Sequence, residues 1–471
     1  MIETRASANA RNGKRARPLL SALLFPRSSV PAIGLAAALT GTLAGCVHPL
    51  PASETEALTR ARTGEIEVRA FQGGYGVDFY EKAAREYEEQ HPGVKIDLKG
   101  DPRIWEQLRP RFVAGNPPGL AFPGWGMDNY ALIYEHQALP LDDVLLTSPY
   151  GEATGTWKAT FIPEVLKLGV YRGQTYLLPY YLTLNGWWYN VNLFAKHGWK
   201  PPTDWDELLL LCEKIKAAGI APLTYQGKYP YYAIQGFLLP WAISEGGIGV
   251  YQAAQALEPD AWKAPAFLHA AEKVDLLRQK GYFLNGSIGL SHTEAQMAFL
   301  NGDAAMIPCG TWLESEMKKQ LPAGFRMAFF LPPRIPGGKG DPTTLQVGVE
   351  PWLLPTQGAN TALALDFFKY LTSPKKAREF VLAKGTLTAV RGSNDDPLPE
   401  TLRGPAAALR NARVTWSTQY TQWYKPLEEG TKTAMTGLLQ GDLTPQQFVD
   451  RCEAEATKVR RDPNIPKHRP E

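Results

Sequence analysis

A strand, a glycine-rich turn, a helix and a second strand follow one another near residue 65, and this pattern constrains the fold more than any other feature. Residues 66–71 alternate in hydropathy, and residues 72–76 read Gln-Gly-Gly-Tyr-Gly. Apolar side chains then recur at helical spacing as far as the Pro-Gly pair at 92–93, and residues 94–98 have strand character. The sequence therefore predicts an α/β fold with a mostly parallel sheet. The glycines lack the spacing of a phosphate-binding loop and predict a turn that faces a ligand.

The length of the chain predicts two lobes. Roughly 420 of the 471 residues follow Cys46, and a single hydrophobic core usually divides above about 250–300 residues. Hydrophobic residues make up 44% and charged residues 21% of the sequence, as in a soluble globular protein. The net charge is only +3, with several positive charges in the leader, so the composition argues against nucleic-acid binding.

The leader has the charge and hydropathy order of a secretion signal. Six basic residues precede an apolar run from about residue 30 to residue 44, which is shorter than the ~20 residues of a membrane-spanning helix. The run ends in Leu-Ala-Gly-Cys at residues 43–46 and resembles a bacterial lipoprotein signal, which implies that residues 1–46 are the signal peptide and that Cys46 is lipidated. The alternative is an ordinary cleaved signal with an incidental cysteine. Residues 47–64 are polar and rich in Pro and Ala, and they predict a flexible tether.

The remaining cysteines do not indicate a metal site or a disulfide framework. Cys212, Cys309 and Cys452 are odd in number and lack metal-ligand spacing, so at most one disulfide is possible. Two of them fall in apolar patterns, which favours buried free thiols. We therefore predict no metal and no cofactor.

Several short segments of the chain stand in an order that resembles one protein family. They are the helix that ends at residues 91–93, a hairpin at 173–179 before Tyr189-Asn190, Pro202-Thr203-Asp204-Trp205 at a helix start with Thr203 as candidate N-cap, residues 301–306 with Gly310-Thr311-Trp312, Leu331-Pro332 with residues 336–338, and Gly348-Val349 before a helix at 367–374. Together they resemble extracellular solute-binding proteins of carbohydrate ABC transporters, from about residue 65 to residue 459.

This resemblance implies a two-lobe periplasmic-binding-protein-like fold of type II, with discontinuous lobes joined by hinge crossovers. By analogy the first lobe comprises residues 65–181 and 344–391, and the second comprises residues 182–343 and 392–471. The implied function is capture of a mono- or oligosaccharide by lobe closure and its delivery to membrane permease subunits. The resemblance also implies a monomer that is anchored to the membrane by lipid and is not an enzyme.

Sugars present flat C–H faces and rings of hydroxyl groups, so a sugar site needs aromatic platforms and planar polar side chains. Trp125, Trp312 and Trp352 each fall at a strand end or loop beside Gly or Pro, and we predict that they stack on sugar. In the family, a Trp at the position of Trp312 commonly does so from the second lobe.

Ten further residues are candidate ligand contacts, mostly from their positions in the family pattern. They are Gly74, Tyr75, Asp128, Tyr181, Asn185, Gln235, Trp241, Gly310, Glu350 and Trp423. For Asp128 the alternative is a helix N-cap, and for Gln235, Trp241 and Trp423 it is packing in the core. For Glu350 and Trp352 the alternative is a surface loop, and one of Trp187 and Trp188 is expected to face the core.

Two other functional classes fit part of the sequence. Asp128 and Glu350 suggest the carboxylate pair of a glycoside hydrolase, but no catalytic motif accompanies them among seven histidines. A lipid-anchored sensor or adhesin would use the same fold without a permease. Residues 304–317 are similar to the subgroup of the family that binds N-acetylglucosamine or chitobiose, which makes an amino-sugar oligosaccharide the leading candidate ligand.

Overall fold

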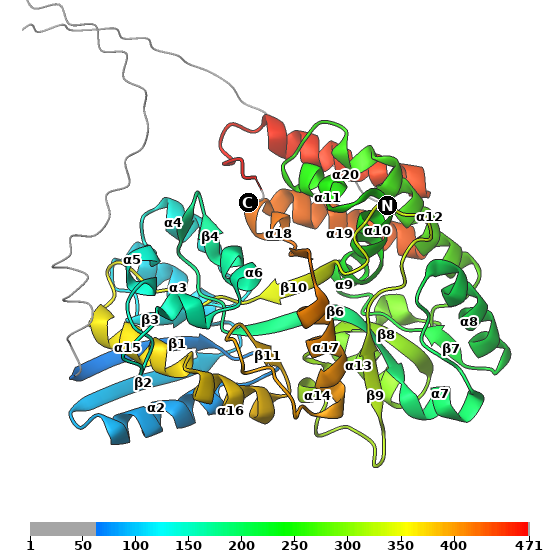
Figure 1. Cartoon of the computed structure of the whole chain (residues 1–471). Coiled ribbons are helices and arrows are strands. Elements are labelled where there is room, and N and C mark those ends of the chain that lie inside the picture. Colours follow the sequence, from blue (N-terminus) through cyan, green and yellow to red (C-terminus); the bar gives the residue numbers. More distant parts are fainter. Residues whose placement is uncertain (1–62, 470–471) are drawn as a thin grey trace, which may run out of the picture. The chain divides into compact units, whose positions relative to one another are not determined.

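The computed structural model describes residues 63–469 of the chain (Figure 1). The predicted signal peptide, Cys46 and nearly all of the predicted tether lie outside the described residues. Among the described residues, no helix combines the length and the apolar character that crossing a membrane requires.

The first sheet is parallel and has the strand order β2-β1-β3, which confirms the predicted β-α-β opening. Its strands are β1 (Gly64–Phe71), β2 (Val94–Asp101) and β3 (Leu120–Phe122). Helices α2 (Asp78–Gln90), α3 (Ile104–Val113) and α15 (Thr361–Leu371) pack on these strands, and α16 (Pro374–Lys384) packs beside α15. We call these elements the first lobe.

The second sheet is mixed and centres on the ten-residue strand β6 (Tyr181–Asn190). The order is β12-β10-β6-β8-β7, and β9 and β11 also pair with β6. The partner strands are β7 (Ala221–Leu223), β8 (Ala304–Gly310), β9 (Met327–Phe330), β10 (Leu345–Val349), β11 (Leu387–Thr388) and β12 (Thr415–Trp416). We call β7, β8, β9 and the helices packed on them the second lobe.

The remaining helices and a small hairpin complete the described part of the chain. The hairpin is β4 (Val170–Tyr171) with β5 (Gln174–Thr175). The α-helices are α4 (Asn129–Tyr134), α5 (Asp142–Leu145), α6 (Pro163–Leu166), α7 (Val191–His197), α8 (Trp205–Ala217), α9 (Tyr231–Ala233), α10 (Leu239–Gly246), α11 (Ile248–Gln255), α12 (Pro265–Gln279), α13 (His292–Leu300), α14 (Leu313–Glu316), α17 (Glu400–Asn411), α18 (Tyr420–Trp423), α19 (Lys425–Gln440) and α20 (Pro445–Arg461). The 3-10 helices are η1 (Trp157–Thr160), η2 (Lys167–Gly169), η4 (Ala261–Lys263) and η5 (Ser287–Gly289), and η3 (Ile234–Leu238) is a π-helix turn.

Strand β6 carries the chain between the lobes and pairs with different strands at its two ends. Its first residues pair with β11 and β10, whereas its last residues pair with β8 and β9. Beyond β10, isolated bridges tie Trp352 to Leu178 and Leu353 to Ala121 at the end of the first sheet. In Figure 1, β6 and β10 lie between the two lobes. The chain thus passes between lobes more than once, and the residue limits given above for each lobe stay predictions.

The structure tests two local predictions made from the sequence, a helix N-cap and the state of the cysteines. The N-cap of α8 is Asp204, whose side chain accepts a hydrogen bond from the Glu207 backbone N–H, so the prediction of Thr203 as the cap was wrong by one residue. The Thr203 hydroxyl instead donates to the Glu207 carboxylate. The thiols of Cys212, Cys309 and Cys452 are buried and free, as predicted.

Tryptophans fill much of the core of both lobes. Trp187 and Trp188 are both fully buried, although alternation along β6 suggested that only one would be. Their indole N–H groups donate to the carbonyl oxygens of Gly236 and Gly310 at 2.8 and 3.2 Å. In the first lobe, Trp352 is also fully buried and stacks on Phe122, with a ring-centroid distance of 5.0 Å. These indoles act as core packing.

The burial of Trp352 predicts a large effect on stability. Trp352→Ala should lower the free energy of unfolding by about 3–5 kcal/mol because it removes the ring that Phe122 and Phe368 pack against. Trp125→Ala is the control, since that side chain is 60% exposed and should change stability by less than about 0.5 kcal/mol. Urea unfolding followed by circular dichroism measures both. Equal losses from the two variants would contradict this placement of Trp352.

Candidate ligand-binding cleft

The turns that follow β1 and β3 lie against each other through one aromatic ring. A Cβ atom on Gly73 or Gly124 would lie 2.6 or 2.5 Å from the Phe71 ring, so glycine is required at both positions for the ring to fit. The Phe71 ring also lies 5.9 Å from Trp105, which lies 4.7 Å from Trp125. Trp125 is therefore held beside the first glycine-rich turn while more than half of its surface remains exposed.

In the second lobe, Trp312 lies flat against the end of β8. A Cβ atom on Gly310 would come within 1.8 Å of the Trp312 ring, so only glycine allows this position. Tyr232 lies 6.1 Å from Trp312, and Tyr231 stacks on Tyr232 at 4.3 Å. All three rings are half-buried, and together they form an aromatic surface in the second lobe.

A polar cluster adjoins this aromatic surface. Glu316 lies one helical turn beyond Trp312, and its two carboxylate oxygens accept hydrogen bonds from His292 Nε2 at 3.2 Å and Gln296 Nε2 at 2.8 Å. The hydrogen bond to Glu316 raises the pKa of His292 above its ordinary value. Because both oxygens are held in place, the remaining lone pairs of the carboxylate are oriented to accept hydroxyl or amide hydrogens of a ligand.

The glycine-rich turn of the first lobe faces this part of the second lobe. A Cβ atom on Gly74 would lie 3.7 Å from the Cβ atoms of both Trp312 and Glu316. The Ser315 hydroxyl is 3.5 Å from the Gly74 carbonyl oxygen, to which it donates a long hydrogen bond. Contacts therefore cross from the end of β1 to the start of α14.

A second set of contacts crosses between the lobes near α18. Tyr130 on α4 lies 5.9 Å from Trp423 on α18. Just before α18, the Thr418 hydroxyl accepts a hydrogen bond from Gln235 Nε2 at 3.1 Å, and Gln235 lies in η3, directly after α9. Residues of α4, α18 and the α9–η3 segment are thereby linked.

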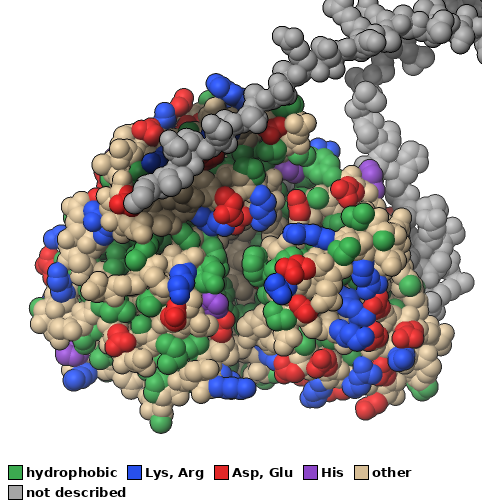
Figure 2. All heavy atoms as spheres, turned by 180° about the vertical axis from the view of Figure 1, so that it is seen from behind, with side chains coloured by type: hydrophobic (Ala, Val, Ile, Leu, Met, Phe, Trp, Pro, Cys, Tyr) green, Lys and Arg blue, Asp and Glu red, His purple; other side chains and the backbone are tan. Residues whose placement is uncertain are grey.

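These contacts form a closed circuit of elements. It runs from the β1 turn to α14, then to α9 and η3, to α18 and to α4, and from α4 back along the chain to Trp125, which packs on Trp105 beside Phe71 and the β1 turn. Elements of both lobes contribute, and Figure 2 shows the surface hollowed between the lobes with hydrophobic side chains on both sides. We call the space that the circuit borders the interlobe cleft.

A cluster of three side chains, Tyr75, Tyr181 and Glu350, lies where the chain passes between the lobes on β6 and β10, and we call this place the crossing. The Tyr181 hydroxyl donates a hydrogen bond to Glu350, and the Tyr75 ring lies 4.9 Å from the Tyr181 ring. The Tyr75 hydroxyl has no hydrogen-bond partner of good geometry, although Thr386, Thr311 and Thr183 lie near enough to affect its pKa. Burial raises the pKa of Tyr75 to about 12 and that of Glu350 to about 7.

The structure brings most of the predicted site residues to the cleft or to this crossing. Those in the circuit are Gly74, Trp125, Gln235, Gly310, Trp312 and Trp423, and those at the crossing are Tyr75, Tyr181 and Glu350. Asn185 lies on β6 two residues after Thr183, so both face the same side of the strand, and both are half-buried. Asp128 is exposed and acts as the N-cap of α4, where it accepts a hydrogen bond from the Ala131 N–H at 2.9 Å.

Two predicted contacts lie elsewhere. Trp241 is fully buried in the second lobe, 5.0 Å from Trp205, and its indole N–H donates to the Pro333 carbonyl oxygen at 3.1 Å. Trp352 is fully buried in the first lobe, as described above. Each fills the core instead of bordering the cleft, because the neighbouring elements enclose the ring on every side.

Several residues of the circuit and of the polar cluster beside it were not among the ligand contacts predicted from the sequence. They are Tyr130, Tyr231, Tyr232, His292 and Glu316. Two signals could have found some of them. Tyr231 and Tyr232 follow Pro230 in an aromatic run, and Glu316 stands four residues after Trp312, which places it one helical turn away.

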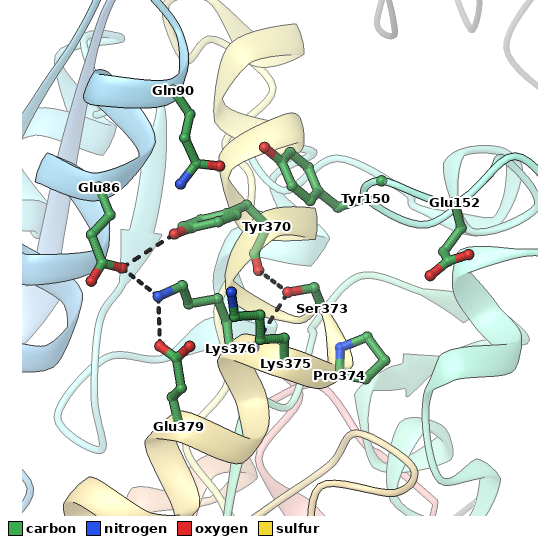
Figure 3. Close-up of a pocket in the computed structure, with 11 residues that line it drawn as sticks. Glu86, Gln90, Tyr150, Glu152, Tyr370, Ser373, Pro374, Lys375, Lys376 and Glu379 are labelled. Atoms are coloured by element: carbon green, nitrogen blue, oxygen red, sulfur yellow. Dashed lines mark hydrogen bonds and ion pairs between the residues drawn. The ribbon is translucent and has the colours of Figure 1, made fainter.

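A separate pocket opens on the first lobe between α2 and α16 (Figure 3). It has a volume of about 520 Å³. The Lys376 ammonium lies between Glu86 and Glu379, and the hydrogen bond from Lys376 lowers the pKa of Glu86. The Tyr370 hydroxyl donates to the same Glu86 at 3.3 Å. These groups already pair with one another, and the two tyrosines that line the pocket, Tyr150 and Tyr370, pack edge to face on each other.

Metal-ligating side chains are not gathered at either place. Within residues 63–469, no three His, Cys, Asp or Glu side chains are grouped so that they could hold a metal ion.

A family model and a similar protein both match this chain, and both are described as binding proteins. Residues 73–378 match a family model described as "Bacterial extracellular solute-binding protein". "Diacetylchitobiose binding protein NgcE" from Streptomyces coelicolor is 29% identical over 419 residues, which cover 86% of this chain and 87% of that protein.

Solved structures match over most of the described residues. "Chitin oligosaccharide binding protein" aligns with a TM-score of 0.68 and 21% identity and covers 83% of this chain and 98% of that chain. "SBP RafE in complex with raffinose" aligns with a TM-score of 0.67 and 22% identity, covering 84% and 99%. These likenesses confirm the predicted two-lobe fold.

The raised pKa of Glu350 predicts a pH effect on stability. Its pKa is about 7 in the folded state against 4.5 for an ordinary glutamate, so the folded state binds more protons between these values. Stability should therefore fall by about 2–3 kcal/mol as the pH rises from about 4.5 to above 7. Urea unfolding of the wild type and of Glu350→Gln, measured from pH 5 to pH 8, tests this. The difference between the two proteins should change over that range, and a constant difference would contradict it.

Proposed function

Because the chain belongs to the bacterial extracellular solute-binding proteins, we propose that it captures a sugar outside the cytoplasm and presents it to the permease of an ABC importer. The observation that carries this proposal is the closed circuit around the interlobe cleft. Trp125 comes from one lobe and Trp312 from the other, and both have exposed ring surface. Aromatic platforms from both lobes, one of them beside a held carboxylate, suit a ligand with flat apolar faces and hydroxyl edges.

Closure of the lobes would complete the site. Rings from both lobes would cover the two faces of the sugar and exclude water, which strengthens the hydrogen bonds to Glu316 and its neighbours. Because the closed form contacts the sugar from both sides, sugar binding would shift the lobes toward closure. The permease would then distinguish the closed, loaded protein from the open one.

We further propose that the ligand is an oligosaccharide of N-acetylglucosamine. Support comes from the relative named as a diacetylchitobiose binding protein and from the structural neighbour named as a chitin oligosaccharide binding protein. Within the site, the carboxylate of Glu316 can accept the N–H of an acetamido group, and Trp312 and Tyr232 offer apolar contact for its methyl.

Hydrolysis fits the cleft less well than capture. The two carboxylates that suggested a glycosidase pair already have other partners, since Asp128 caps α4 and Glu350 accepts the Tyr181 hydroxyl. The family and the relatives described above are binding proteins. A sensor or adhesin with the same fold would bind the same sugar, and co-purification with permease subunits would favour import.

The lipid anchor and the monomeric state are also proposals. They follow from the sequence at residues 43–46 and from the fold family, and the anchor lies outside the described residues. Lipidation at Cys46 would keep the protein at the membrane surface beside its permease.

Trp312 gives a direct test of the proposed sugar site. Trp312→Ala should weaken binding of diacetylchitobiose about 10- to 100-fold, because a stacking surface is lost. Isothermal titration calorimetry measures the affinity, and the melting temperature of the unliganded variant should stay close to that of the wild type because the ring is half-buried. Trp199→Ala is the matched control, since Trp199 is a half-buried indole of the second lobe that stacks on His197 outside the circuit. Unchanged affinity in Trp312→Ala would remove Trp312 from the site.

The anchor has its own test. Cys46→Ser should abolish incorporation of radiolabelled palmitate in cells and move the protein from the membrane fraction to the soluble fraction. Cys212→Ser is the control, because that thiol is buried in α8 and should not affect lipidation. Continued labelling of Cys46→Ser would exclude this residue as the anchor.

A further inference from the structure

The segment after α20 returns to the interlobe region and places His468 in a closed aromatic site. The His468 side chain stacks on Trp423, with ring centroids 5.2 Å apart and planes 18° from parallel. Its backbone N–H donates to the Tyr424 hydroxyl at 2.7 Å. Only 6% of the residue is exposed, so the segment covers the face of Trp423.

Three tyrosines of the chain before β6 form the other walls. The ring centroids of Tyr130, Tyr134 and Tyr171 lie 5.8, 5.7 and 5.9 Å from that of His468. We call the five residues Tyr130, Tyr134, Tyr171, Trp423 and Tyr424 the aromatic box. The box joins α4 and β4 to α18, and two of its members, Tyr130 and Trp423, belong to the circuit around the cleft.

The His468 imidazole lacks a hydrogen-bond partner at one of its ring nitrogens. Burial, together with the positive charges of Arg172 and Lys467, lowers the pKa of His468 to about 4, so the ring is neutral near pH 7. Its Nδ1 atom is buried without a hydrogen-bond partner. Because a buried polar atom without a partner costs free energy, it makes binding of the segment to the box less stable.

We propose that the aromatic box is a carbohydrate subsite, and that the segment from Asp462 to Arg469 covers it when no sugar is bound. The proposal rests on the proposed function. The imidazole is a flat ring with polar edges that lies parallel to an indole, which is the arrangement in which a sugar ring packs on tryptophan. The Trp423 indole N–H is also buried without a hydrogen-bond partner, and a sugar hydroxyl can accept from it, so a sugar can displace the segment.

The segment can leave without unfolding a lobe. Several of its hydrogen bonds are internal, such as those from the Lys467 ammonium and the Asn464 backbone N–H to Asp462. Its hydrogen bonds to the box are the pair between Tyr424 and the His468 backbone. Release therefore breaks few contacts beyond the ring stacking itself.

Competition of this kind lowers the apparent affinity for sugar. If the segment occupies the box about nine-tenths of the time, the apparent dissociation constant is about 10-fold higher than that of the uncovered site. The segment thus raises the sugar concentration at which half of the sites are occupied.

The first test removes the ring that fills the box. His468→Ala should bind diacetylchitobiose about 3- to 10-fold more tightly than the wild type in isothermal titration calorimetry at pH 7.5. Arg469→Ala is the control, because the exposed neighbouring side chain lies outside the box, and its affinity should equal that of the wild type. Equal or weaker binding by His468→Ala would overturn the proposal, and weaker binding would identify the segment as part of the sugar site or as a support for it.

The second test follows the segment directly. Arg469→Cys labelled with bimane, a dye that nearby tryptophan quenches, should brighten when diacetylchitobiose saturates the protein, because the segment leaves Trp423. The three described cysteines are buried and should label slowly. Sugar binding without brightening would overturn this inference and leave the proposed function standing. Failure of chito-oligosaccharides and other sugars to bind the wild type, His468→Ala and Arg469→Ala would overturn the proposed function and this inference with it.

Discussion

The hydrogen bonding of β6 is the constraint on which the rest of the structure depends. This one strand of ten residues pairs with β10 and β11 at its start and with β8 and β9 of the second lobe at its end. A strand whose backbone groups are paired along its length keeps its register while it twists. The lobes can therefore change their angle at the crossing without losing the core of either, which is the movement that sugar capture needs.

The cleft follows from this crossing and from a few positions where only glycine fits. The Phe71 ring occupies the space beside Gly73 and Gly124, and the Trp312 ring occupies the space beside Gly310. These close approaches place the rings that line the cleft at strand ends, where the loops are exposed. Ring position is thus fixed by the backbone, so the site can be largely formed before a sugar enters, and closure and the movement of the segment that carries His468 would control access.

Local patterns in the sequence were sufficient for much of the fold. The opening β-α-β unit and the buried free thiols were predicted from hydropathy, helix-stop residues and cysteine count. The resemblance to solute-binding proteins supplied the two lobes, which the comparisons confirm. Local patterns did not distinguish a tryptophan that lines the cleft from one that packs in the core, because both kinds stand in the same sequence context. Trp312 and Trp352 both follow strands beside Gly or Pro, yet one ring is half-exposed and the other is completely enclosed.

The sequence by itself determined the family, the α/β character and the existence of aromatic candidates near strand ends, because these depend on spacing within short stretches of chain. Only the tertiary structure decided which rings meet across the cleft. Burial depends on what packs from elsewhere: Trp241 is enclosed by Trp205 and Trp187, and Trp423 is covered by His468, which lies 45 residues further along the chain. Such contacts between distant segments leave no periodic signal, so the core role of Trp241 and the aromatic box became visible only in three dimensions.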